Sequence, residues 1–311
     1  MRSTIKFNLI LVISLIIMIF LTSCAGLKEK KEMLTTCEKI TDARIKNTCL
    51  AIAEKDTAPC DKISDNRENV DEKDFCYMAV ALKTKQSSIC EKLSTTPTSG
   101  PLPYTSKFTC KALVENSSSG CDEAFQKEFY GKDCYVRLAE LTKNAGLCDR
   151  YAQAVGIQGV QTSECKAIIE RDITKCSKED LSKCYSQLAI LKGDISLCNS
   201  MPNAPNIPDI KQLEVKEICS AVAKRDVTNL DCIVEIKTAY TSDDIIFTQR
   251  ACIALAALTE DVSICDKIVI KGDWVSPDPA PKDKCYLNII LLKSDILPIE
   301  TIINNLGRIW E

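Results

Sequence analysis

The 311-residue sequence has no histidine, no Cys-x-x-Cys pair and only 5% aromatic residues. Without histidine, any proton transfer must rely on carboxylates, lysines or tyrosines. A zinc site made of cysteines normally begins with two closely spaced cysteines, whereas the nearest two here, Cys176 and Cys184, are eight positions apart. Walker-type, Gly-x-Gly-x-x-Gly and Gly-x-Ser-x-Gly motifs are also missing. We therefore expect no metal, no cofactor and no enzymatic activity.

The chain instead carries nineteen cysteines, and the first follows a sequence typical of export. Arg2 and Lys6 form a positive start, and a largely apolar run of 13 residues extends from Leu9 to Leu21. A membrane-spanning helix needs about 20 apolar residues, so this run favours a cleaved signal over a permanent span. Residues 1–23 are therefore predicted to be a signal peptide.

The residues Leu21-Thr22-Ser23-Cys24 resemble the lipobox of bacterial and some archaeal lipoproteins. That resemblance implies that Cys24 becomes the lipidated first residue, with residues 24–36 as a polar tether and residues 37–311 as the folded domain. It places the protein on the extracytoplasmic face of the cell membrane, held by a lipid anchor in the cell envelope. A plain secretory signal or an uncleaved anchor remains the alternative, with Cys24 incidental.

Net charge argues against a nucleic-acid partner. Without residues 1–23 the chain has 38 Lys and Arg against 43 Asp and Glu, a net charge of −5. Nucleic-acid binding requires a basic face that neutralises phosphates, and no basic stretch here supplies one. A protein or glycan partner is the expectation.

The remaining eighteen cysteines alternate between variable and nearly fixed spacings. Nine variable steps of 8 to 21 positions are separated by steps of 11, 14, 11, 14, 11, 14, 13 and 13 positions. A fixed step indicates rigid structure and a variable step indicates a loop. After the second cysteine of several pairs, aliphatic residues and alanines recur at helical spacing, as in Cys76-Tyr-Met-Ala-Val-Ala-Leu and Cys184-Tyr-Ser-Gln-Leu-Ala-Ile-Leu.

The helix starts are predicted around the first cysteine of each pair. Ser88 with Glu91, and Ser263 with Asp266, have the spacing of a capping box, and the second cysteine is expected near the start of the returning helix. Aspartates that recur before Ser or Thr are expected to serve turns and caps, as at Asp56, Asp172, Asp194, Asp226, Asp261 and Asp295. Tyrosines directly after a cysteine are expected to be packing residues, as at Tyr77, Tyr135, Tyr185 and Tyr286.

Two antiparallel helices bring residues at equal distance from their loop together, so nearest-neighbour disulfides are predicted. Shifting the pairing by one would join cysteines about a helix length apart, beyond the roughly 7 Å that a disulfide can bridge. The predicted pairs are Cys37 with Cys49, Cys60 with Cys76, Cys90 with Cys110, Cys121 with Cys134, Cys148 with Cys165, Cys176 with Cys184, Cys198 with Cys219, Cys232 with Cys252 and Cys265 with Cys285.

A pair start every 22 to 34 residues predicts an all-α repeat array of about nine disulfide-stapled αα-hairpins, stacked as an α-solenoid. This array resembles the helical-hairpin class of tetratricopeptide and Sel1-like repeats, and similar Cys-Tyr-x-x-Leu-Ala repeats occur in uncharacterised exported prokaryotic proteins. The tetratricopeptide Trp-Leu-Gly-Tyr pattern and the Sel1 glycine framework are missing. No functional residue can be carried over from these families.

Three long loops inside hairpins are rich in proline and should emerge at one edge: residues 94–106, 201–210 and 273–283. With Tyr104, Phe247 and Trp274 they offer an aromatic binding edge, and inert surface loops are the alternative. We expect a membrane-anchored binding or scaffold lipoprotein. The rival readings are an envelope enzyme that uses carboxylates such as Asp243 and Asp244 in a long loop, and a thiol redox or metal-handling lipoprotein.

Overall fold

The computed structural model describes residues 27–64, 70–94, 106–127, 133–155, 160–179, 181–203, 209–226, 228, 232–235, 242–271 and 281–301. These residues are mainly helical and contain all nine predicted disulfides, with Cα–Cα distances of 5.5 to 6.0 Å. The predicted nearest-neighbour pairing is therefore confirmed. So many disulfides indicate an oxidising, extracellular-type environment.

Each hairpin has a returning helix, which we define as the one that carries the second cysteine of its pair. The nine returning helices are α2 (Ala43–Glu54), α4 (Val70–Thr84), α5 (Lys107–Glu115), α7 (Asp133–Thr142), α9 (Val160–Glu170), α10 (Leu181–Lys192), α12 (Asp209–Lys224), α13 (Ser242–Thr259) and α15 (Pro281–Lys293). The intervening leading elements are α3 (Ala58–Asp61), η1 (Ser87–Lys92), α6 (Ser118–Lys127), α8 (Gly146–Val155), η2 (Ile173–Lys175), α11 (Ile195–Asn199) and α14 (Val262–Lys267).

One local turn ends every returning helix. The first residue after the helix, or in the ninth hairpin the second, adopts a left-handed conformation, with φ between 53° and 67° at Lys55, Lys85, Asn116, Lys143, Arg171, Gly193, Arg225, Glu260 and Asp295. In the first eight hairpins the next backbone N–H bonds back to an alanine carbonyl, as in Asp56 N to Ala51 O at 3.1 Å, which is the Schellman pattern. Such a turn satisfies carbonyls that the helix end would leave unpaired.

In five hairpins an aspartate after the left-handed position then caps the next element. Asp172, Asp194 and Asp261 accept hydrogen bonds from the backbone N–H two residues on, at 2.9 to 3.0 Å. Asp56 and Asp226 do the same at 3.1 and 2.9 Å, which confirms the predicted capping role of these aspartates. The capping boxes predicted at Ser88 and Ser263 are wrong, because the aspartate or glutamine that precedes them already occupies the cap position.

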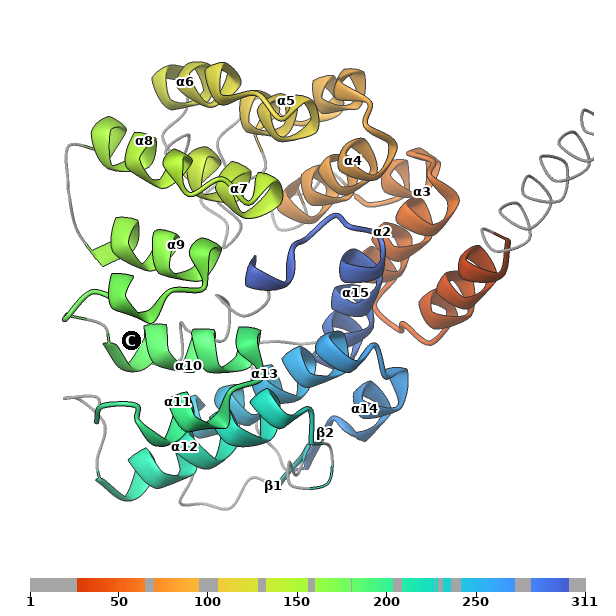
Figure 1. Ribbon diagram of the computed structural model, residues 1–311. Helices are drawn as coiled ribbons and strands as arrows, with labels where there is room; N and C mark the ends of the chain where they lie inside the picture. Colours follow the sequence, from red (N-terminus) through yellow and green to blue (C-terminus); the bar gives the residue numbers. More distant parts are fainter. Residues whose placement is uncertain are drawn as a thin grey trace, which may run out of the picture.

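The hairpins close into a ring. Each returning helix contacts the next one along the chain, and α15 contacts α2 (Figure 1). Sequential stacking therefore holds, but the predicted solenoid does not remain an open array. The end faces of an open array would need polar capping units to stay soluble, whereas here the first and last hairpins bury each other.

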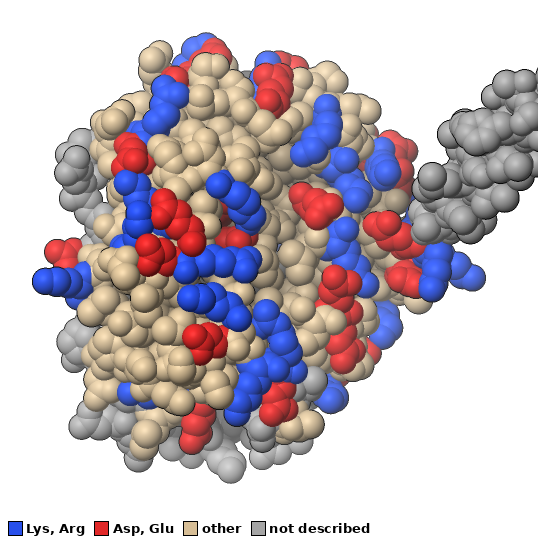
Figure 2. Space-filling model, in the orientation of Figure 1, with Lys and Arg blue, Asp and Glu red and all other residues tan. Residues whose placement is uncertain are grey.

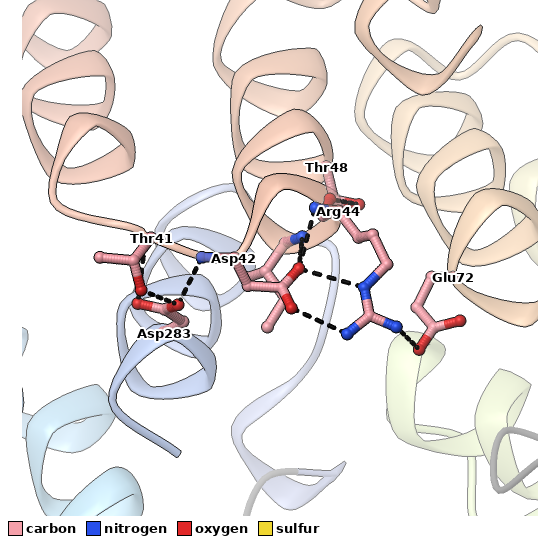
Figure 3. A network of polar contacts seen from close by, with 7 residues as sticks. Thr41, Asp42, Arg44, Thr48, Glu72 and Asp283 are labelled. Atoms are coloured by element: carbon pink, nitrogen blue, oxygen red, sulfur yellow. Dashed lines mark hydrogen bonds and ion pairs between the residues drawn. The ribbon is translucent and has the colours of Figure 1, made fainter. Parts of the chain in front are cut away.

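The junction between the last and first hairpins repeats the chemistry of an ordinary neighbouring pair. Asp283, two positions before Cys285, accepts hydrogen bonds from Thr41 N at 3.2 Å and Asp42 N at 2.7 Å (Figure 3). In the equivalent place between the second and third hairpins, Asp74 accepts from Ser94 N at 2.9 Å. The closing junction therefore uses the same contact as a junction between hairpins that are neighbours in the sequence.

A tyrosine, an aspartate and a cation form the same three-membered contact at three hairpin junctions. The phenol after the second cysteine donates to the carboxylate after the first, and a cation from the next hairpin lies over the ring at 5.2 to 5.9 Å. The three sets are Tyr77, Asp61 and Lys92; Tyr135, Asp122 and Arg150; and Tyr286, Asp266 and Lys39. In the last set the next hairpin is the first one, which again identifies the ring closure.

Four details differ from the sequence expectations. Two short parallel strands, β1 (Ile233–Glu235) and β2 (Val269–Lys271), lie in the mainly helical described part of the chain, where β-branched residues favour extended backbone. Residues 27–38 of the expected polar tether and its continuation form a helix, and Met33 is buried.

The second cysteine is not always near a helix start, because helices such as α12 and α13 begin ten residues before it. The first cysteine also does not open a helix in every hairpin. Cys37 lies near the end of the helix over residues 27–38, Cys176 follows η2, and Cys232 precedes β1. Residues that were expected to form a variable loop are therefore part of the returning helix in these hairpins.

Candidate functional site

Most of the residues that the sequence marked for function lie outside the described part of the chain. This applies to Cys24, Tyr104 and Trp274, together with most of residues 94–106 and 273–283 and half of residues 201–210. Phe247 lies in α13, and its side chain is outside the described set. Asp243 and Asp244 also fall in α13, so their placement in a long loop was wrong.

The tyrosines that follow cysteines are packing residues, as predicted, and they have an additional polar role. Tyr77, Tyr135 and Tyr286 are all at most 5% exposed. Burial, followed by the hydrogen bond to Asp122, raises the pKa of Tyr135 to about 12. Burial and Asp266 likewise raise the pKa of Tyr286. These phenols stay protonated near neutral pH and act as hydrogen-bond donors, not as general bases.

The cysteines are equally unsuited to exchange chemistry. All eighteen from Cys37 to Cys285 are in disulfides, and all except Cys176, which is half-buried, are buried. An attacking thiolate must reach a sulfur atom, so burial protects these bonds. Within the described ranges no group of three or more potential metal ligands is present, and no helix there has the length and apolar character needed to cross a membrane.

The most unusual polar arrangement lies where the residues that follow α15 meet two distant hairpins. After α15 the chain crosses the middle of the ring toward α7 and α9, as the dark blue trace in Figure 1 shows. We call residues 296–301 the C-terminal segment. We call the polar residues around its end the central cluster, which consists of Arg137, Glu140, Lys143, Arg171, Glu300 and Thr301.

Two returning helices position the basic side chains of this cluster. Arg137 and Glu140 lie one turn apart on α7 and form an ion pair of 2.9 Å. Lys143 follows α7 and Arg171 follows α9, each at the left-handed position that ends its helix. The carbonyl end of a helix favours cations, so both positions suit basic residues.

The C-terminal segment supplies a carboxylate and a hydroxyl to these groups. Lys143 Nζ pairs closely with Glu300 Oε2, and Arg171 Nη2 lies 4.0 Å from Glu300 Oε1. Thr301 Oγ1 accepts from Arg137 Nη1 at 2.7 Å and donates to Glu140 Oε2 at 2.6 Å. Such an arrangement can recognise a carboxylate beside a hydroxyl, and it pairs the buried carboxylates of Glu140 and Glu300, which would be costly to leave unpaired.

Charged residues are mixed on the visible surface. In Figure 2, Lys and Arg gather toward the middle of the face, over the ends of α7, α9 and α10, and acidic residues flank them on both sides. On this face the basic groups are therefore local and interrupted by acidic ones. Charge of this kind suits a small acidic group better than a long polyanion.

The sequence analysis did not identify the central cluster, although one signal was present. In the aligned repeats, Arg137 and Glu140 stand where the second hairpin has Ala79 and Leu82. Those two counterparts are buried apolar residues. A charged pair on an otherwise apolar helix face therefore marked α7 as different. The contribution of Glu300 and Thr301 could not be found this way, because it depends on the path of the chain after α15.

Comparison with known proteins gives no relative: the chain matches no protein-family model, no curated protein and no solved structure.

Proposed function

We propose that this protein is a lipid-anchored binding or scaffold protein of the cell envelope, acting on the extracytoplasmic face of the membrane through a protein or glycan partner. The observation that carries this proposal is the disulfide in each of the nine hairpins. A short hairpin of two helices is marginal in water, and a covalent link in each one suits a rigid support outside the cytoplasm.

The anchor is inferred from the Leu21-Thr22-Ser23-Cys24 sequence, and the helical tether would hold the ring close to the membrane surface. In this arrangement the hairpins stack as in a repeat solenoid, but the array closes into a ring. The proposed outer contact edge consists of the proline-rich stretches with Tyr104 and Trp274, together with Phe247 of α13. Buried disulfides speak for a structural role of the cysteines over the redox alternative.

Intact mass spectrometry of the protein isolated from its native envelope tests the anchor. We expect a mature chain that begins at Cys24 and carries added acyl mass, and a Cys24→Ala variant that loses this mass and leaves the membrane fraction. A mature chain that begins elsewhere, or an unmodified Cys24, would refute the lipid anchor.

Affinity capture from envelope extracts tests the binding role. The folded protein should recover a partner, and Trp274→Ala combined with a shortened loop over residues 94–106 should abolish that recovery while the disulfides and helicity are retained. Unchanged recovery with this variant would move the contact away from the proline-rich loops. Loss of recovery only after reduction would support the redox alternative.

A further inference from the structure

The C-terminal segment occupies an interior position although it follows the last hairpin. Ile296 is 1% exposed, and Glu300 and Thr301 are also buried. The contacts of Glu300 and Thr301 are with residues 129 to 164 positions earlier in the chain. Ring closure itself is made by other groups, with Asp283, Asp266 and Tyr286 holding the first hairpin. The central cluster is thus separate from the contacts that close the ring.

The two residues at the end of the segment are recognised by different chemistry. The Glu300 carboxylate is held by two cations, Lys143 and Arg171, which come from two hairpins. The Thr301 hydroxyl is held between a donor, Arg137, and an acceptor, Glu140. A charge-assisted pair beside a two-sided hydroxyl contact specifies an acidic residue followed by a hydroxyl residue.

The exposure of these groups is asymmetric. The Glu300 side chain is 2% exposed, whereas the Lys143 and Arg171 side chains are 51% and 52% exposed. Water and salt therefore reach the cations, while the carboxylate is covered. A well-packed apolar residue often stabilises a core as well as a buried ion pair does, so stability alone does not account for this pairing.

From these contacts we infer that the central cluster is a peptide-binding site. Its ligand class is an acidic segment of a partner protein with a Glu-Thr-like pair, and the C-terminal segment occupies the site as an internal competitor. The inference rests on the proposed binding role and names the chemistry of one partner contact. It does not depend on the lipid anchor or on the proline-rich loops.

Internal competition has a measurable consequence. When only a fraction of molecules has the site open, the apparent dissociation constant for an external peptide equals the intrinsic value divided by that fraction. Glu300→Gln removes the charge that both cations hold and leaves the basic side of the site intact. We therefore expect this variant to bind an external acidic peptide at least tenfold more tightly than the wild type.

The test uses the full chain and a fluorescent peptide with the sequence Asp-Ile-Leu-Pro-Ile-Glu-Thr, copied from residues 295–301. Binding is followed by fluorescence anisotropy at low salt. A second peptide with Gln in place of Glu should bind at least tenfold more weakly. In the Glu300→Gln background, Lys143→Gln should cost a further tenfold, whereas Lys55→Gln should have no effect. Lys55 is a matched control, since it ends α2 in the same left-handed conformation.

Failure of the Glu300→Gln variant to bind the peptide, or equal binding of the two peptides, would overturn the inference. Hydrogen exchange of the wild-type protein is a second test of the inference, and it needs no variant. We expect amides of residues 299–301 to exchange at least tenfold faster than those of α7, and exchange only together with α7 would identify the segment as a fixed part of the core. If the peptide does not bind but envelope capture still recovers a partner, this inference fails and the proposed function stands.

Discussion

Replacing Asp283 by alanine should open the ring at its closing junction. This carboxylate is 4% exposed and accepts hydrogen bonds from Thr41 N, Thr41 Oγ1 and Asp42 N at 3.2, 2.9 and 2.7 Å. The substitution leaves two backbone N–H groups without this acceptor, and each such loss costs about 1 to 3 kcal/mol when the group is buried. Both groups lie at a part-buried junction, so the low end applies, and a total of about 2 kcal/mol raises the population of the open ring roughly thirtyfold.

Native-state hydrogen exchange measures this effect locally. We expect Asp283→Ala to accelerate exchange in the helix over residues 27–38, in α2 and in α15, and to change α7 and α9 little. Asp74→Ala is the matched control, because Asp74 holds Ser94 N in the equivalent place between the second and third hairpins. That variant should loosen α4 and η1 and leave the closing junction intact.

The reasoning on ring closure would be refuted by either of two results. One is an Asp283→Ala variant whose exchange in α2 and α15 matches the wild type. The other is acceleration spread evenly over all nine hairpins, which would mean that the junction is not a separate unit of stability.

Three further predictions concern pH and the disulfides. Arg44 beside Asp42 holds the pKa of the Asp42 carboxyl below its usual 3.8. The stability that the Asp42 carboxylate gives is therefore complete above pH 3.8 and is lost as the pH falls below that value. Asp42→Asn should accordingly lose less stability than the wild type during acid unfolding. Tyr135, with its pKa raised to about 12, should ionise near that pH in an ultraviolet titration, and the stability it gives should be present below pH 10 and fade as the pH rises through 12; ionisation of all tyrosines near pH 10 would contradict this. Double alanine substitution of Cys198–Cys219, separated by 21 residues, should cost about 1 kcal/mol more in denaturant unfolding than that of Cys176–Cys184, separated by 8, because the longer loop restricts the unfolded chain more; an equal or reversed order would argue against the entropic account.

Local order in this protein could be predicted well where it depends on short-range chemistry. The aspartates at 172, 194 and 261 cap the following helices because a carboxylate two residues before an N–H group can reach it wherever this turn occurs. The capping box at Ser263 failed for the same reason, since Asp261 caps that helix, whereas the element at Ser88 begins after Gln86, which makes no side-chain cap hydrogen bond. Helix starts were also misjudged, because α12 and α13 extend well into what spacing alone marked as loop.

The sequence by itself determined that the protein belongs in an oxidising environment, that its repeating unit is a helical hairpin, and which cysteines pair. These follow from the cysteine spacing, because two antiparallel helices joined by a short loop leave few geometries that place sulfur atoms within bonding reach. Tertiary structure alone decided that the array closes and that Glu300 and Thr301 meet Arg137, Lys143 and Arg171. Both outcomes depend on the small rotation between neighbouring hairpins summed over nine units, and no local spacing in the sequence carries that sum.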